Sequence, residues 1–100
     1  MPTPHVRFPQ ASLAEFCRRH YIQRLALFGS VVRDDFRPDS DVDVLVEFEA
    51  GHVPGFDFAG MEMELTALVG RKVDLRTPRE FSARSREHIA ATSVVQYVAE

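Results

Sequence analysis

Apolar and polar residues alternate along two stretches of the chain, as they do in half-buried β-strands. In residues 41–48 four apolar side chains share one face: Val42, Val44, Val46 and Phe48. The other face begins with two carboxylates, and its members are Asp41, Asp43, Leu45 and Glu47. Residues 72–76 repeat the pattern, with Val73 and Leu75 inward and charged residues outward. Both stretches are predicted strands.

Two further strands follow from composition. Residues 22–28 are rich in apolar and β-branched types and stop at Gly29-Ser30, so we predict a strand that ends there, followed by a helical turn at 30–33. Residues 94–99 favour a short final strand.

Helical spacing appears between the strands. Ser12 and Glu15 fit a capping box, which predicts a helix that begins at Ser12. Apolar residues recur at helical spacing over 57–69, and Gly70 supplies a left-handed stop. Thr77-Pro78-Arg79-Glu80 has a capping Thr, a Pro at the first helical position and a Glu three residues after the cap, which predicts another short helix.

These elements predict an α/β (α+β) fold with a mixed sheet of three to four strands and flanking helices. The length of 100 residues allows one domain, residues 1–100. Three prolines and a lack of periodicity predict a flexible end at 1–11, with the packed domain beginning near Ser12.

Composition narrows the class of protein. Hydrophobic types make up 45% and charged types 27%, which is typical of a globular domain. Cys17 is the single cysteine, so an intrachain disulfide is excluded. The chain has no apolar run of membrane-spanning length and no leader pattern, so we predict a cytoplasmic protein without a membrane partner. A net charge of −3 does not favour direct nucleic-acid binding.

The chemistry is concentrated where the first two strands meet. Antiparallel pairing would bring Gly29 and Ser30, at the end of one strand, to Asp41 and Asp43, at the start of the next. Two carboxylates on one side repel each other unless they are solvated or bridged by a cation, and carboxylate oxygens suit Mg²⁺. Gly29 lets a phosphate approach the backbone, and Ser30 offers a hydroxyl and an N–H. The set favours phosphoryl or nucleotidyl transfer.

A pair of metal ions needs a third carboxylate, and Asp74 is the only acid on the polar face of the next strand. Asp74 could instead pair with Lys72 or Arg76. Arg33 could contact a phosphate or pair with a nearby aspartate of the connection: Asp34, Asp35 or Asp39. The four histidines are scattered without metal-ligand spacing. An EF-hand starting at Asp39 is excluded, because its sixth and twelfth positions lack Gly and Glu.

The run Leu27-Phe28-Gly29-Ser30-Val31-Val32-Arg33, followed by Ser40-Asp41-Val42-Asp43-Val44-Leu45-Val46, resembles the Gly-Ser-x10-Asp-x-Asp signature of the DNA polymerase β-like nucleotidyltransferases. With Gly70-Arg71-Lys72-Val73-Asp74-Leu75 it resembles the smallest members, the minimal nucleotidyltransferase antitoxins found beside HEPN-family toxins. The similarity runs from about residue 12 to the last residue.

The resemblance implies a polymerase β-like fold with catalytic Asp41, Asp43 and Asp74, which would bind two Mg²⁺ ions. It implies nucleotide contacts by Gly29, Ser30 and Arg33, with ATP as donor. It further implies transfer of AMP to a tyrosine of a partner HEPN-family ribonuclease toxin, which silences the toxin.

Two other functions stay open. The chain could neutralise its partner by steric binding alone, or it could modify an antibiotic or an RNA. A chain of this length has little room for an acceptor-binding domain, which favours a protein acceptor with its own docking surface.

Overall fold

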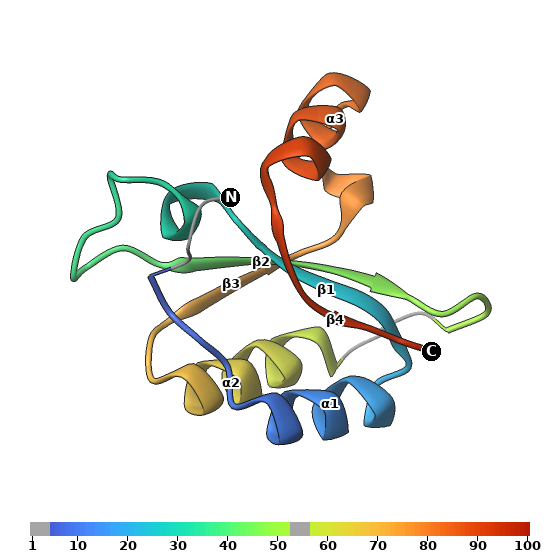
Figure 1. Ribbon diagram of the computed structural model, residues 1–100. Coiled ribbons are helices and arrows are strands. Elements are labelled where there is room, and N and C mark those ends of the chain that lie inside the picture. The colour runs from blue at the N-terminus through green and yellow to red at the C-terminus, as the bar shows by residue number, and fades with distance from the viewer. Residues whose placement is uncertain (1–4, 53–56) are drawn as a thin grey trace.

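The computed structural model of the protein describes residues 5–52 and 57–100, which form a four-stranded sheet with helices on both faces (Figure 1). The strands are β1 (Ile22–Phe28), β2 (Val42–Phe48), β3 (Val73–Arg76) and β4 (Val94–Val98). The helices are α1 (Gln10–Arg19), α2 (Phe58–Val69) and α3 (Ala83–Thr92), with 3₁₀ turns η1 (Gly29–Val32) and η3 (Pro78–Glu80). The predicted mixed sheet with flanking helices is confirmed.

The strand order is β3-β2-β1-β4. β1 pairs with both β2 and β4 in the antiparallel sense, whereas β2 and β3 are parallel. The parallel pair is possible because α2 carries the chain back across the sheet between β2 and β3. This topology brings the end of β1 and the starts of β2 and β3 to one end of the sheet.

The two faces of the sheet are covered by different helices. α1 and α2 lie together on one face, and α3 stands on the other (Figure 1). The main core lies between the sheet and the helices α1 and α2. It includes Leu13, Phe16, Leu25, Leu27, Val44, Val46, Met61 and Leu65. The α3 face holds a much smaller cluster of Phe28, Leu45 and Ile89, with Phe81 packed against it.

The first helix begins earlier than predicted. α1 starts at Gln10 with Pro9 as its N-cap and without a side-chain cap, so the predicted capping box at Ser12 is wrong. Phe8 is buried in the main core, and the backbone N–H of His5 donates to the carbonyl of Val31 at 2.9 Å. The packed domain therefore begins before Ser12, because an apolar anchor ahead of the helix fixes where the chain enters it.

The segment after β3 forms two short elements instead of one helix. The predicted capping box between Thr77 and Glu80 is present, but it caps the single turn η3. Phe81 then returns to an extended conformation, with φ −114° and ψ 151°. Its ring makes an edge contact with Phe28, with centroids 5.8 Å apart. A new cap, Ser82, accepts a hydrogen bond from the N–H of Ser85 and starts α3.

The other predicted elements are confirmed to within one residue at either end. Gly70 ends α2 in the left-handed conformation with φ 76°, as expected. The first four residues of the predicted flexible end lie outside the described residues. Within the described ranges, no helix has the length and apolar character needed to cross a membrane.

Candidate active site

The turn after β1 brings Gly29 against Asp43. Antiparallel register places Phe28 opposite Asp43, so the next residue along the chain lies beside the Asp43 side chain. Gly29 has φ +75°, and a Cβ at this position would overlap Oδ2 of Asp43 and lie 3.2 Å from its Cγ. Any other residue would be strained and would displace the carboxylate. The close approach of backbone and carboxylate predicted for this corner is thus present.

Ser30 lies in η1, directly after this contact. Its carbonyl accepts a hydrogen bond from the N–H of Arg33 at 2.9 Å, which closes the turn. Ser30 is partly exposed.

Asp43 and Asp74 are neighbours across the parallel pair β2 and β3, where they occupy the same register position. Burial raises the pKa of Asp43, and the negative charges of Asp74 and Asp41 raise it further. Arg76 and Arg33 oppose this shift without cancelling it. The three aspartates singled out in the sequence therefore form one electrostatic cluster, with Asp43 at its centre.

Two of these aspartates have basic partners. Asp41 Oδ2 lies 3.8 Å from Lys72 Nζ, and Asp74 Oδ2 accepts a hydrogen bond from Arg76 Nη2 at 3.0 Å. Of the alternatives open for Asp74, the structure has the pair with Arg76. Across residues 5–52 and 57–100, no three acidic, His or Cys side chains are gathered closely enough to ligate one cation in this conformation.

The donor set nevertheless fits Mg²⁺. All three side chains offer hard carboxylate oxygens, and a cation among them would relieve the repulsion that raises the pKa of Asp43. Asp41 and Asp74 would then exchange Lys72 and Arg76 for the cation, and both aspartate side chains are partly exposed. Asp41, Asp43 and Asp74 are the residues that could hold the metal.

Arg33 has a partner within its own loop. Its Nε donates to Oδ1 of Asp35 at 3.1 Å, one of the alternatives left open by the sequence. Arg33 also lines the pocket beside Gly29 and Asp43. Both side chains of this pair are more than half exposed, so the pair is weak enough to yield to a bound phosphate.

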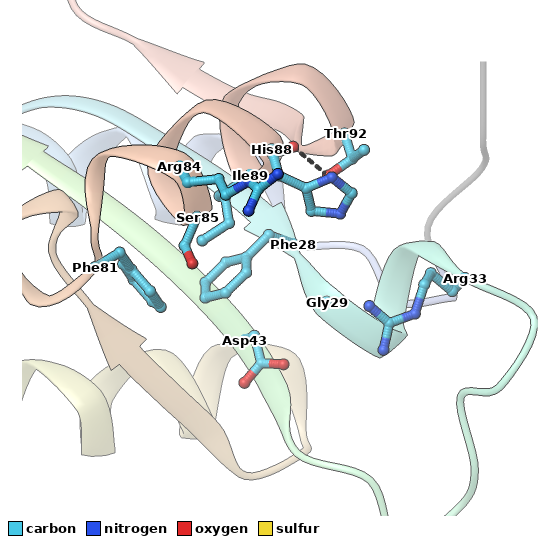
Figure 2. Close-up of a pocket in the computed structure, with 10 residues that line it drawn as sticks. All are labelled: Phe28, Gly29, Arg33, Asp43, Phe81, Arg84, Ser85, His88, Ile89 and Thr92. Carbon is cyan, nitrogen blue, oxygen red and sulfur yellow. Dashed lines mark hydrogen bonds between the residues drawn. The ribbon is translucent and has the colours of Figure 1, made fainter.

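A pocket of about 590 Å³ lies between the sheet and α3, next to Gly29 and Asp43. Figure 2 shows side chains of α3 at the top of the pocket, Arg33 at one side and Asp43 at the bottom, on β2. The wall formed by α3 includes Arg84, Ser85 and His88.

Sequence reasoning missed these three residues. No motif marks them, and they reach the site only because α3 covers this face of the sheet and leads into β4, whose first residue pairs with Leu27 near the end of β1. The i, i+4 spacing of Arg84 and His88 on one helix face was the one available signal.

A cysteine nucleophile is excluded. Cys17 lies on the buried face of α1, and burial raises the pKa of its thiol to about 12. The thiol therefore stays protonated at neutral pH and faces away from the pocket, in the main core.

Comparison with known proteins places this geometry in a family. Residues 11–95 match the family model described as nucleotidyltransferase domain. The chain is 42% identical over 62 residues to the protein adenylyltransferase MntA of Thermococcus cleftensis, which is 61% of each chain. It thus spans about three fifths of the length of the curated relatives it matches.

Solved structures agree on the fold. A structure assigned as a minimal nucleotidyltransferase superposes with a TM-score of 0.70 at 35% identity, covering 85% of this chain and 86% of the other. A toxin–antitoxin structure with AMP-PNP has a TM-score of 0.70 at 18% identity, covering 92% and 75%. The second likeness shows the fold alone. Because the family model covers most of the chain and the glycine–aspartate corner is in place, this chain belongs to the nucleotidyltransferase domain family.

Proposed function

We propose that this protein is a Mg²⁺-dependent adenylyltransferase that moves AMP from ATP to a tyrosine of a HEPN-family toxin and so acts as its antitoxin. The observation that carries the proposal is the corner at the end of β1, where Gly29 packs against Asp43 and Asp43 lies beside Asp74. The relative from Thermococcus cleftensis, named a protein adenylyltransferase, and the toxin–antitoxin structure with AMP-PNP support it.

Each residue of the corner has a role in this proposal. Gly29 and Ser30 bind the phosphates, because the missing Cβ lets the backbone lie directly beside Asp43 and Ser30 is partly exposed next to it. Arg33 leaves Asp35 to contact the triphosphate. Asp41, Asp43 and Asp74 hold Mg²⁺, which neutralises the phosphate charge and polarises the reacting oxygens. The pocket between the sheet and α3 holds the rest of the nucleotide.

Asp74 is the proposed general base. Arg76, at 3.0 Å, orients its carboxylate, which accepts the proton of the tyrosine hydroxyl as that oxygen attacks the α-phosphorus of ATP. The new bond joins the tyrosine oxygen to the α-phosphorus. The bond from that phosphorus to the bridging oxygen breaks, and pyrophosphate leaves with the electron pair.

Steric neutralisation is the second candidate. One observation favours it: Asp41 and Asp74 are engaged with Lys72 and Arg76 in this conformation. In that case the chain would bind and silence its partner without changing the partner's mass.

The first step of the test is to establish whether the adjacent reading frame encodes a HEPN-family protein. That protein is then incubated with the purified protein, Mg²⁺ and ATP, and its intact mass is measured. The toxin should gain AMP with the wild-type protein and with Asp57→Asn, which alters an exposed aspartate directly before α2, outside the pocket. It should gain none with Asp43→Asn. Equal rates for Asp43→Asn and wild type would overturn the catalytic proposal. Neutralisation without a change in mass would support the steric one.

A further inference from the structure

The connection between Ser30 and Asp41 is held by an arginine that lies outside the signature. Arg71 follows Gly70 in the turn between α2 and β3. Its Nη2 lies 2.9 Å from each of three backbone carbonyl oxygens, and it donates to all of them: those of Arg37, Pro38 and Ser40. One side chain therefore satisfies most of the carbonyls in the last turn before Asp41.

Aromatic stacking fixes the middle of the same connection. The Arg71 guanidinium lies over the ring of Phe36, with Cζ 4.7 Å from the centroid. The His5 ring stacks on Phe36 at 5.2 Å, and its Nε2 lies 2.7 Å from the carbonyl oxygen of Arg33. The loop is thus tied at its start by the N-terminal segment and at its end by Arg71.

These contacts lead directly to Asp41. The backbone before it forms a tight turn, in which the N–H of Ser40 donates to the carbonyl of Arg37 at 3.0 Å and the N–H of Arg37 donates to Ser40 Oγ at 3.0 Å. The backbone after it is tied to the residue next to Arg71, because the N–H of Val42 donates to the carbonyl of Lys72 at 2.8 Å. Asp41 therefore sits between two anchors from the 71–72 segment.

We propose that Arg71 is a positioning residue, which holds the backbone before Asp41 so that this carboxylate faces Asp43 and a cation bound between them. The inference rests on the proposed function for its catalytic consequence. The three carbonyl contacts come from one nitrogen, Nη2, while the rest of the guanidinium plane lies over the Phe36 ring. A lysine ammonium could reach some of the carbonyls but has no plane to stack on the ring, so lysine is a partial substitute. Arg71 also lies close to the second part of the site, since it stands two residues before β3, the strand that carries Asp74.

The test compares Arg71→Met and Arg71→Lys with a control variant, Arg24→Met. Arg24 is an arginine of β1 whose side chain pairs with Glu47 at 3.2 Å. In Arg71→Met, amide hydrogen exchange at Ser40 and Val42 should accelerate while amides of β1 and α2 keep their rates. Mn²⁺ affinity, measured by electron paramagnetic resonance with a non-hydrolysable ATP analogue, should fall about tenfold, as for other groups that orient metal ligands.

The third measurement is the steady-state rate of AMP transfer. Arg71→Met should lower kcat for AMP transfer about 100-fold with little change in KM for ATP, because misplacement of a reacting group affects the chemical step most. The kcat of Arg71→Lys should lie between the values of Arg71→Met and wild type. Added guanidinium ion should restore part of the rate of Arg71→Met. Arg24→Met should match wild type in all three measurements.

The outcomes separate the two proposals. Unchanged exchange at Ser40 and Val42, or acceleration shared equally by β1 and α2, would overturn the positioning role. Wild-type protein that transfers no AMP would contradict the proposed function, and exchange and Mn²⁺ affinity would then decide the role of Arg71 by themselves.

Discussion

The two faces of the sheet differ in how completely they are packed. On the face covered by α1 and α2, side chains such as Phe16, Leu65 and Val44 are fully excluded from solvent. On the α3 face, Phe28 and Ile89 keep 9% and 8% of their surface exposed, and a pocket of about 590 Å³ remains beside them. The first face provides most of the hydrophobic stabilisation, and the second leaves space for a ligand.

The acidic groups of the candidate site lie on the less completely packed face of the sheet, which is covered by α3. Asp43 and Asp74 alternate with buried valines and leucines, so they project from the α3 face of the sheet. There Asp43 is held, partly buried, near like charges, which is unfavourable for the empty protein. Such an arrangement is typical of a site whose groups are set for binding more than for stability.

The largest effect on stability should come from removing a buried side chain from the well-packed face. Phe16→Ala should lower the free energy of unfolding by about 3–5 kcal/mol, because a fully buried ring leaves a cavity. Phe81→Ala, which removes a partly exposed ring in edge contact with Phe28, should lower it by less than about 2 kcal/mol. Urea unfolding of both variants measures this, and equal losses would contradict the unequal packing of the faces.

Removing the central charge of the α3 face should have opposite effects on activity and stability. Asp43→Asn should lower the AMP transfer rate at least about 100-fold, because it removes a ligand from the proposed cation site. The same change should raise the melting temperature of the protein without ligand at neutral pH, since it ends the repulsion with Asp74 and Asp41. Thermal melts and transfer assays on one preparation test both.

The rise in melting temperature expected for Asp43→Asn should decrease as the pH is lowered. Because the pKa of Asp43 is raised in the folded state, its charge destabilises the fold at neutral pH, and protonation removes this penalty as pH falls through the raised pKa. The melting temperature difference between Asp43→Asn and wild type should therefore shrink from neutral pH to about pH 3, below the ordinary aspartate range. A constant difference would show that charge is not its cause.

Two glycines share the same left-handed backbone conformation, but they differ in their surroundings. Replacing each with alanine therefore distinguishes backbone strain from a steric clash with a neighbouring side chain. Gly29 and Gly70 have φ of +75° and +76°, but only Gly29 lies against another side chain, that of Asp43. Alanine at either position should lower stability by about 1–2 kcal/mol. Only Gly29→Ala should also reduce AMP transfer and nucleotide binding. Loss of transfer in Gly70→Ala to the same degree would assign the effect to backbone strain alone.

The smallest effect is expected where α3 joins β4. The Ser93 hydroxyl is buried and has no hydrogen-bond partner within the described parts of the chain. Ser93→Ala should raise the free energy of unfolding by up to about 1 kcal/mol, because an unpaired hydroxyl is unfavourable away from water. Thermal melts measure the change, and a loss of stability would show that the hydroxyl has a favourable contact.

Much of the fold and the centre of the site could be predicted from local pattern. Period-two alternation placed Val42, Val44 and Val46 on the core face, where they are buried, and thereby placed Asp43 on the opposite face. The spacing of Gly29 and Asp43 around an antiparallel pair predicted their contact, because strand geometry fixes which residues meet. Leu45, which shares the polar face, could not be predicted to be buried, since α3 covers it.

The sequence by itself thus determined the strands, the faces of the sheet and the meeting of Gly29 with Asp43, because each depends on neighbours within one strand or one hairpin. Only the tertiary structure decided that α1 begins at Gln10, that Asp74 pairs with Arg76, and that Arg71 holds the loop before Asp41. It also decided that α3 supplies a wall of the pocket. These features depend on side chains brought together from distant segments, and no local periodicity encodes such contacts.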